Sequence, residues 1–489
     1  MALRRALAGW IEERTGLIGA GRRFLTEDIP GGASYWYVFG SATLFALIVQ
    51  VLTGILLTLY YAPSAATAWE STKYIYTQVP LGSFLISLHY WGASAMIALV
   101  VLHVLQVIVW GAYKRPREAQ WIIGVVLLGL TFLMGLTGYL LPWDLNAYFA
   151  SAVTINIAGS VPVVGPAIQA LLQDGATIGT LTINRFFGIH IWLTPLALIA
   201  ITVLHLVVFR HNGGAGRWRQ TAAPAPGSVR AFWPKQIYMD TLAAAAICAA
   251  IVVLAIASPA PFDVKADPNR LNFQPYPAWY FLALFGLLNM LPPQLELVAT
   301  VVVPTIIAAL LVLLPWLDRS PSRAPSRRPW VLGGTALVLL GAVVLSVQAQ
   351  ASIDARRAAT GAAASMMAVV PSASSPKISR GSTVYTTNCI GCHQANGQGV
   401  AATFPPLASN PFVVGEPAKV ARVVLFGLTG PLQVNGHTFN SQMPAWKDSL
   451  SDEDIAEVIT FVRASWGNAG GSVSASIVHT ARVSPGAAK

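Results

Sequence analysis

Two apolar stretches of the chain each begin and end on a histidine. The first reads His89-Tyr-Trp-Gly-Ala-Ser-Ala-Met-Ile-Ala-Leu-Val-Val-Leu-His103, and the second reads His190-Ile-Trp-Leu-Thr-Pro-Leu-Ala-Leu-Ile-Ala-Ile-Thr-Val-Leu-His205. In an α-helix, their separations of 14 and 15 residues are both close to four whole turns, or about 21–22 Å of axial rise. Each stretch therefore carries two imidazoles on roughly one helix face, one toward each end.

These stretches lie within two of seven long apolar segments. The 489 residues are 55% hydrophobic and only 10% charged, whereas soluble domains are about 25% charged. This composition excludes an ordinary cytosolic enzyme, and so much apolar content also excludes a disordered chain. A transmembrane helix needs about 20 mostly apolar residues. The predicted spans are residues 34–61, 83–112, 121–142, 186–209, 237–257, 294–317 and 330–349.

Lysine and arginine are sorted between the two sets of connecting segments. The N-terminus and the segments after the second, fourth and sixth helices hold seventeen of them, and the opposite loops hold four. The positive-inside rule then makes the N-terminus cytoplasmic, and seven crossings place everything after residue 350 on the outer face. This sorting accounts for nearly all of the net charge of +11, so no nucleic-acid partner is expected.

The four histidines inside the predicted spans are candidate haem ligands. Imidazole is a strong axial ligand for haem iron, and ligation by two histidines leaves no open site, which suits electron transfer. Ionisable groups at membrane depth are functional by default. We expect His89 to pair with His190 near the outer surface, and His103 with His205 near the inner one. The alternative is that these histidines only pack and hydrogen-bond within the bundle.

Glycines recur at the same interval on the first and third predicted helices. A flat macrocycle between helices needs missing side chains where it presses on the backbone. We therefore expect these glycines to make room for haem, although small residues are also ordinary contacts between membrane helices. They are Gly40, Gly54, Gly124 and Gly138.

A second haem motif lies beyond the last apolar segment. Cys389-Ile-Gly-Cys392-His393 is the attachment sequence of a c-type haem. A redox or zinc site is the alternative, but no other cysteine follows the last span. We expect Met443 as the sixth ligand, because a thioether raises the potential, with His437 as its competitor. Covalent attachment also implies the outer, oxidising compartment.

Four short motifs add to the histidines. They are Trp-Ile-Glu-Glu-Arg at 10–14, Lys-Arg-Pro-Arg-Glu at 114–118, Gly-Tyr-Leu-Leu-Pro-Trp-Asp at 138–144 and Asn-Arg-Phe-Phe at 184–187. With these motifs, the chain resembles cytochrome b of the quinol–cytochrome c oxidoreductase (cytochrome bc complex) family over roughly residues 8–350, followed by a class I cytochrome c domain over 377–466. The helix count and the 15-residue spacing are similar to the chloroplast type, in which cytochrome b is split from a three-helix subunit.

The resemblance implies an all-α polytopic membrane protein. Its seven transmembrane helices would form a four-helix di-haem bundle followed by three helices, and a soluble α-helical cytochrome c domain would end the chain. The expected parts are 1–30 (cytoplasmic amphipathic segment), 31–230 (di-haem bundle), 231–349 (three-helix part), 350–376 (linker), 377–470 (cytochrome c domain) and 471–489 (disordered tail).

The resemblance also implies an activity. Membrane quinol would be oxidised near the outer face, around Trp143, Asp144, Trp279 and Tyr280, with release of protons. Electrons would pass through two non-covalent b-type haems to an inner quinone and outward to one covalent c-type haem. Near the inner face, Asp240, with His211 and Lys235, could supply protons to the reduced quinone. A charged residue at that depth is also a common anchor or helix cap.

The implied partners follow from the same family. They are a Rieske iron–sulfur protein, whose Cys and His ligand pairs this chain lacks, and a soluble cytochrome c or terminal oxidase as electron acceptor. A homodimeric complex in a bacterial inner (cytoplasmic) membrane is expected, with the cytochrome c domain on the periplasmic face.

Two positions depart from the family pattern. Where the outer quinol site usually reads Pro-Glu-Trp-Tyr, this chain has Ala278 in place of the glutamate, and alanine cannot accept a proton. Asp144, Tyr276 and Tyr280 are the nearest substitutes, although Asp144 could equally be a helix or turn cap. Val38 stands where the chloroplast type binds an extra haem through cysteine, so a covalent third membrane haem is not expected.

Two other functions remain open from the sequence. One is a quinone-linked haem subunit of another membrane dehydrogenase, without bifurcation of quinol electrons. The other, from a different class, is a haem-bearing sensor or assembly protein with no turnover of its own.

Overall fold

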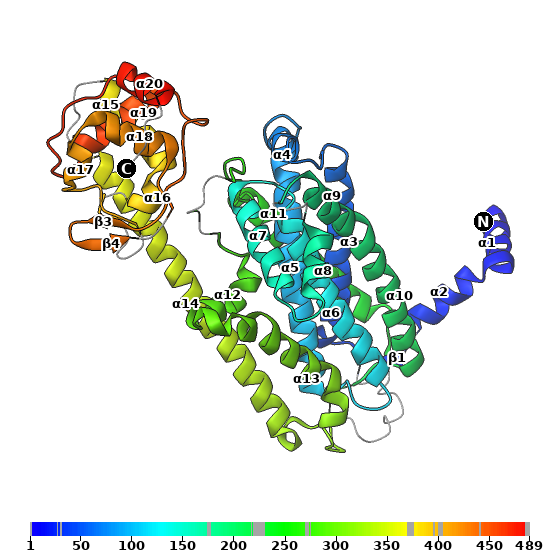
Figure 1. Cartoon of the computed structure of the whole chain (residues 1–489). Helices are drawn as coiled ribbons and strands as arrows, with labels where there is room; N and C mark the ends of the chain where they lie inside the picture. Colours follow the sequence, from blue (N-terminus) through cyan, green and yellow to red (C-terminus); the bar gives the residue numbers. More distant parts are fainter. Residues whose placement is uncertain are drawn as a thin grey trace. The chain divides into compact units, whose positions relative to one another are not determined.

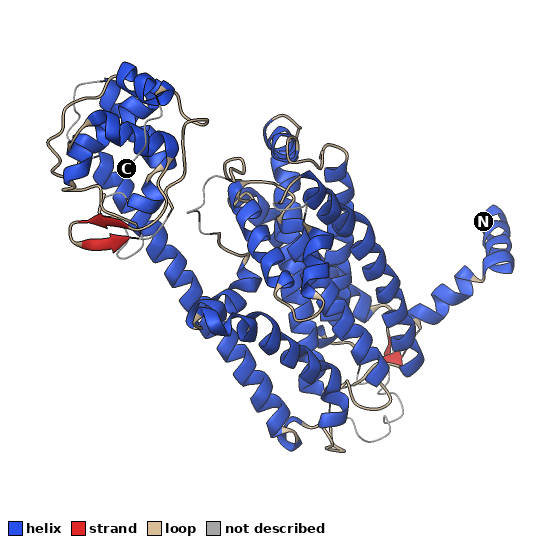
Figure 2. Cartoon of the chain, viewed as in Figure 1, coloured by secondary structure: helices blue, strands red, loops and turns tan. Residues whose placement is uncertain are grey.

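The computed structural model describes residues 2–484 apart from 27, 30–31, 174–177, 217, 219–229, 269–272, 274, 369–375, 395–396, 400–403 and 440–441. Nearly all of the regular structure is helical (Figure 2). The chain forms two compact units, one of residues 1–266 and 275–349, the other of 267–274 and 350–489.

Within the described part of the chain, seven helices are long and apolar enough to cross a membrane, which confirms the predicted count and positions; Figure 1 shows how they run. Exposed leucine, isoleucine and valine side chains cover them, as expected for helices surrounded by lipid. They are α3 (Val38–Thr58), α5 (Gly82–Trp110), α6 (Glu118–Tyr139), the continuous α9–η2–α10 (Thr180–Gly188, Ile189–Leu193, Thr194–Asn212), α11 (Lys235–Ala257), η5–α13 (Val298–Val302, Val303–Leu317) and α14 (Pro329–Ala368).

Four of these helices form the central bundle. α3 packs along α5, α10 packs along α6, and α5 contacts α6. α11 lies against α3 and α5, and α13 lies against α6. Short connecting helices complete the unit: η1 (Tyr35–Tyr37), η3 (Trp279–Phe281), α12 (Leu282–Met290), η4 (Pro293–Leu295) and η6 (Pro325–Arg327).

Short helices also cover the end of the bundle at which α5 begins. α4 (Ala68–Thr77) contacts α5, while α7 (Leu145–Gly159) and α8 (Gly165–Leu172) lie side by side. α7 and α8 thus lie in the connection between the two long helices α6 and α9–η2–α10. Their small apolar core contains Ala68, Leu140, Trp143, Tyr148, Ile155, Ile183 and Phe186.

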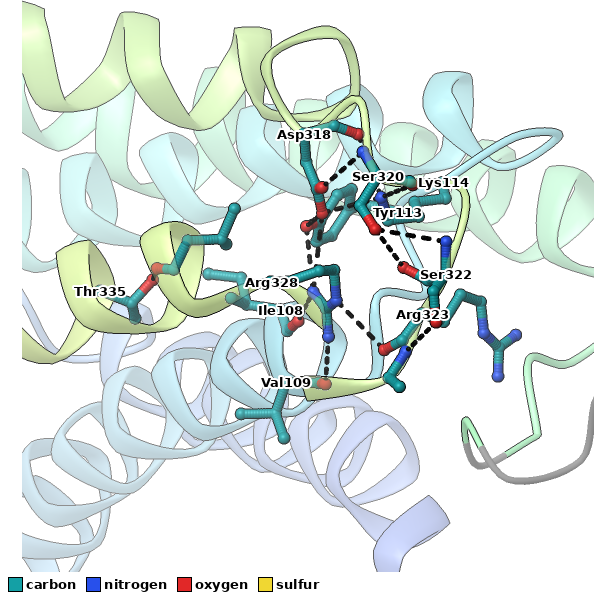
Figure 3. A network of polar contacts seen from close by, with 12 residues as sticks. Ile108, Val109, Tyr113, Lys114, Asp318, Ser320, Ser322, Arg323, Arg328 and Thr335 are labelled. Carbon is teal, nitrogen blue, oxygen red and sulfur yellow. Dashed lines mark hydrogen bonds and ion pairs between the residues drawn. The ribbon is translucent and has the colours of Figure 1, made fainter. Parts of the chain in front are cut away.

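A buried polar network joins the loop after α5 to the loop after α13 (Figure 3). Asp318 accepts a hydrogen bond from the hydroxyl of Tyr113 and lies 2.9 Å from Nζ of Lys114. Nη1 of Arg328 lies 3.8 Å from the same carboxylate oxygen, and the Arg328 side chain is fully buried. Burial opposes ionisation of Asp318, but hydrogen bonds from Lys114 and Tyr113 prevail, so the pKa of Asp318 is lowered.

Arg328 also caps the C-terminal end of α5. Its guanidinium donates to the carbonyls of Ile108 at 2.8 Å and Val109 at 2.6 Å, which belong to the last turn of the helix, where the regular i to i+4 partners run out. The helix ends at Gly111, whose φ of +59° is left-handed, and a Cβ there would lie 3.1 Å from Cζ of Arg328. The three-helix part of the chain thus fixes the end of a bundle helix.

The N-terminal segment, expected to be amphipathic, contains two helices among its described residues. α1 (Ala2–Thr15) and α2 (Leu17–Leu25) are separated at Gly16, whose φ is +63°. Leu3, Leu7 and Trp10 of α1 are exposed. β1 (Asp28–Ile29) then pairs antiparallel with β2 (Arg230–Ala231).

The C-terminal unit is a small helical domain with one hairpin. α15 crosses α19 at Gly381, where a Cβ would lie 2.1 Å from the carbonyl oxygen of Glu457. Fully buried Tyr385 packs against Phe461 and Trp466 at the centre of the core. The elements are α15 (Pro376–Asn388), α16 (Ile390–His393), α17 (Pro411–Val414), α18 (Pro417–Phe426), β3 (Leu432–Val434), β4 (His437–Phe439), α19 (Asp452–Arg463) and α20 (Ala475–Val483).

The linker expected over 350–376 stays a prediction. Its residues are helical as far as Ala368, because α14 continues through an alanine-rich stretch and alanine has the highest helix propensity; residues 369–375 lie outside the described part. The expectation for the tail was wrong. The tail expected to be disordered over 471–489 contains α20, whose Val478 and Ala481 are buried in the core. Residues 485–489 lie outside the described part.

Candidate functional site

The four bundle histidines form two pairs, each with one member from α5 and one from the α9–η2–α10 helix. The ring centroids of His89 and His190 lie 6.3 Å apart, with the rings inclined by 76°. Metal–imidazole bonds are about 2.0–2.1 Å long, so one ion between these rings could bind both. His103 and His205 line one cavity of about 780 Å³ at the other end of the bundle, within the range of about 300–1,000 Å³ for ligand pockets.

Each of the four predicted glycines faces one histidine ring. A Cβ on Gly138 would lie 2.6 Å from Cε1 of His190, and one on Gly54 would lie 3.3 Å from Cε1 of His89. At the other pair, Cβ atoms on Gly124 and Gly40 would lie 3.4 and 3.5 Å from Cε1 of His205 and His103. The structure therefore brings all eight predicted residues together, one glycine of α3 or α6 to each histidine.

A π-helical turn explains the unequal histidine spacing. Residues Ile189–Leu193 form η2, and the N–H of Thr194 donates to the carbonyl of Ile189, five residues earlier. Pro195 follows and has no N–H for the carbonyl of Ile191, which disturbs the α-helical pattern. A π-turn contains one residue more than an α-turn. The 15-residue spacing on this helix thus matches the 14-residue spacing on α5.

Two threonines of the bundle were missed by the sequence analysis. Oγ1 of Thr53 lies 2.9 Å from Nδ1 of His89, and Oγ1 of Thr137 lies 3.1 Å from Nδ1 of His190. Both threonines directly precede a histidine-facing glycine, within Leu-Thr-Gly at 52–54 and 136–138. The repeated Leu-Thr-Gly was the pattern in the sequence from which the two threonines could have been predicted.

The cavity at the His103–His205 pair extends to polar groups. Asp240 and Gln236 line it together with Arg117 and Arg210. The amide of Gln236 donates to Asp240 at 2.9 Å and accepts from the backbone N–H of Ser34. His211, predicted to act with Asp240, is exposed at the end of α10 and does not line this cavity.

Trp279 and Tyr280 lie on η3, and each contacts a helix that contributes to the His89–His190 pair. Nε1 of Trp279 donates to Oγ of Ser94 at 3.2 Å. The hydroxyl of Tyr280 would lie 2.9 Å from a Cβ on Gly135, one turn of α6 before Gly138. The structure therefore places both aromatic residues against the two helices, α5 and α6, within about one and a half turns of His89 and Gly138.

Asp144 is the N-cap of α7. Its two carboxylate oxygens accept from the backbone N–H groups of Ala147 at 2.8 Å and Asp263 at 3.2 Å. The side chain is buried, and this burial raises the pKa of Asp144. Asp144 was considered either as a proton acceptor or as a helix cap, and these contacts are those of a helix cap.

The Cys389–His393 motif lies at the end of α15 and on α16. Nδ1 of His393 lies 3.0 Å from the carbonyl oxygen of Pro405, which can only accept, so the proton is on Nδ1 and Nε2 is free for a metal. Burial raises the pKa of the Cys389 thiol to about 12, whereas reactive redox thiols have lowered values. The described residues contain no cluster of three or more histidine, cysteine or acidic side chains suited to a metal ion.

The two candidate sixth ligands lie on different segments of this unit: Met443 forms an isolated β-bridge, and His437 lies on β4. Met443 is bonded through its backbone to Leu428 in both directions, at 2.9 and 3.1 Å. This bridge requires Gly427, whose φ is +73° and whose Cβ would lie 2.4 Å from the Met443 carbonyl. His437 begins β4 and pairs with Val434.

Comparison with known proteins identifies the family of each part of the chain. Three family models match: cytochrome b/b6/petB at 25–213, cytochrome b(C-terminal)/b6/petD at 265–369 and cytochrome c at 378–466. The menaquinol:cytochrome c reductase cytochrome b subunit of Geobacillus thermodenitrificans is 39% identical over 43% of this chain and 97% of its own. Cytochrome b of Allochromatium vinosum is 32% identical over 64% of this chain and 81% of its own.

A solved structure named hyperthermophilic respiratory Complex III has a TM-score of 0.63 and 28% identity, over 70% of this chain and 91% of its own. The fold and site thus define a membrane-integral, haem-binding electron-transfer protein. The chain belongs to the cytochrome b/b6 family of bc-type complexes, and it carries a C-terminal cytochrome c domain in the same polypeptide.

Proposed function

We propose that this chain is the electron-transfer subunit of a quinol–cytochrome c reductase. The observation that carries the proposal is that one bundle contains two histidine pairs, one toward each end, with a glycine facing each histidine ring. The haems held there would supply one-electron transfer with no open coordination site. His89 with His190 and His103 with His205 would ligate two b-type haems, and Cys389, Cys392, His393 and Met443 would hold one c-type haem.

The residues around these pairs have separate roles in the proposal. Trp279 and Tyr280 would line the quinol site at the His89–His190 end, which the distribution of basic residues makes the outer end. Asp240 would hold a proton for a quinone at the other end, since it lines the cavity there and His211 does not. The N-terminus would be cytoplasmic, and the cytochrome c domain would lie on the periplasmic side of a bacterial inner membrane.

The partners are part of the same proposal. A Rieske iron–sulfur protein would take one electron from the quinol, and the c-type haem would pass it to a soluble cytochrome c or a terminal oxidase. Relatives of this chain bear the names of menaquinol:cytochrome c reductase subunits, which supports a quinol substrate. A homodimeric assembly is proposed by analogy with the family alone.

Quinol-dependent reduction of cytochrome c in membranes tests this proposal. Menaquinol and ubiquinol analogues would be supplied in turn, with and without an inhibitor of the outer quinol site. We expect turnover that the inhibitor abolishes, together with co-purification of an iron–sulfur protein. The absence of inhibitor-sensitive turnover with either quinol would contradict the proposal.

One observation favours a second function, that of a haem subunit of a membrane dehydrogenase that does not bifurcate electrons. Ala278 removes the family's proton acceptor, and both oxygens of its nearest acidic substitute, Asp144, are already engaged as a cap. Co-purification with a molybdenum or flavin protein, and without a Rieske protein, would support this second function.

A further inference from the structure

The hydrogen bonds at the His89–His190 pair fix which ring nitrogen carries the proton. The hydroxyl of Thr53 donates to the carbonyl of Val49 at 2.7 Å, so it can only accept from Nδ1 of His89. The hydroxyl of Thr137 donates to the carbonyl of Leu133 at 2.8 Å and accepts from His190 in the same way. Both imidazoles therefore carry hydrogen on Nδ1 and present a free Nε2 lone pair.

The other pair has no such acceptors among the described residues. Nδ1 of His103 and Nδ1 of His205 are buried without a hydrogen-bond partner. The side chain of Gln106 and the backbone of Gln120 lie nearby but do not meet hydrogen-bond geometry. The two ligand pairs, alike in their glycines, thus differ in what supports each imidazole.

The sequence carries the same asymmetry. Thr53 and Thr137 directly precede Gly54 and Gly138, which face the His89–His190 pair. Phe39 and Ile123 occupy the equivalent places before Gly40 and Gly124. Both threonine side chains are more than nine-tenths buried, at 7% and 2% exposure. One hydroxyl is therefore supplied at each histidine of one pair and at neither histidine of the other.

We propose that Thr53 and Thr137 are positioning residues that set the redox potential of the outer b-type haem below that of the inner one. This inference rests on the proposed function, in which His89 and His190 ligate that haem. A hydrogen-bond acceptor at Nδ1 makes an imidazole a more basic ligand, and a more basic ligand favours ferric over ferrous iron. Electrons arriving at the outer haem then pass downhill to the inner one.

The test compares potentiometric titrations of the b-type haems in the purified complex, for wild type, Thr53→Val and Thr137→Val. Valine keeps the volume and removes the hydroxyl. We expect one b-type step to move to higher potential, the same step in both variants, while the other stays unchanged. A tenfold change in the ferric preference corresponds to about 59 mV for one electron.

Two further sets of variants keep the test decisive. Thr300→Val is the matched control, because Thr300 is buried in a membrane helix and donates to the carbonyl of Glu296 at 2.9 Å. Thr53 and Thr137 donate to a carbonyl four residues earlier in the same way. The Thr300 variant should shift neither b-type step. Thr53→Ser and Thr137→Ser retain the hydroxyl, so both should keep wild-type haem content and potential even if a valine variant loses the haem.

Several results would overturn the inference. One is a valine variant that keeps both b-type haems at wild-type potentials, and another is a shift of the two steps together. Loss of the haem in the serine variants as well would indicate that side-chain volume, and not the hydroxyl, is what matters. Failure of the proposed function would look different: wild type would lack inhibitor-sensitive quinol turnover, or, if the histidines do not ligate haem at all, it would lack two b-type haems.

Discussion

The imidazole rings of His89 and His190 lie 6.3 Å apart and 76° from parallel, although 100 residues of sequence separate them. The hydroxyls of Thr53 and Thr137 fix the tautomer of both rings, and Gly54 and Gly138 leave space against them. Four helices thus contribute to one ligand pair, and each contribution can be altered separately.

Substitution of these glycines by alanine should cause more loss of haem where the added Cβ lies closer to a histidine ring. Gly138→Ala places a Cβ 2.6 Å from the His190 ring, while Gly40→Ala makes an ordinary contact of 3.5 Å. Overpacking of this kind costs about 1–3 kcal/mol. We expect a marked loss of b-type haem in Gly138→Ala, a smaller loss in Gly54→Ala, and little in Gly40→Ala, measured as the ratio of b to c absorbance.

Gly129→Ala is the control for this series. Gly129 lies on α6 between Gly124 and Gly138, and a Cβ there would meet nothing within 4 Å. Its haem ratio should equal that of wild type. Equal losses at Gly129 and Gly138 would contradict the role assigned to the histidine-facing glycines.

A single-residue deletion should be tolerated in the π-turn and harmful in α5. Removing Trp192, which is 65% exposed, converts the five-residue turn to an α-turn and keeps the histidines in register. Removing Ala93 from the regular part of α5 rotates His89 by about 100° relative to His103. Haem spectra should show both b-type haems in the first variant and the loss of at least one in the second. The reverse order would show that η2 does not compensate for the extra residue.

Breaking the buried network should destabilise the membrane unit. Asp318→Ala leaves Lys114 and Arg328, 11% and 0% exposed, without their carboxylate, and removing one partner of a buried pair costs about 3–5 kcal/mol. Glu70→Gln is the matched control, because its ion pair with Lys265 at 3.1 Å is exposed and exposed pairs contribute about 0–1 kcal/mol. Thermal loss of b-type haem in detergent should occur at a lower temperature in Asp318→Ala only.

The docking of α20 on the cytochrome c domain should weaken in acid. Burial opposes ionisation of Asp452, but hydrogen bonds from Arg482 at 2.7 Å and His479 at 3.0 Å hold the pKa of this carboxyl below its ordinary value. A lowered carboxylate pKa stabilises the folded state above the unfolded value, and that contribution is lost as the pH falls through the folded value. The melting temperature, followed by the c-haem Soret band, should differ between wild type and Asp452→Asn at pH 7 and converge in acid. An unchanged difference at low pH would exclude this cause.

Much of the architecture could be predicted from the sequence, because membrane spans and the haem-attachment motif are local patterns. The π-turn could not, because it depends on the N–H that Pro195 lacks and on packing that fixes where the extra residue goes. α20 was missed because its buried residues, Val478 and Ala481, are few and stand among glycine, serine and alanine. Arg328 was counted only as a basic loop residue, since its contacts with α5 lie about 220 positions away in the sequence.

The most direct test is the haem content of the purified complex for wild type, His89→Leu and His190→Leu, measured by pyridine haemochrome spectra, with potentiometric titration to identify which b-type haem remains. We expect two b-type haems and one c-type haem in wild type. We also expect loss of one and the same b-type haem in both variants, with the c-type haem retained. A single b-type haem in wild type, or loss of different haems in two folded variants, would contradict it.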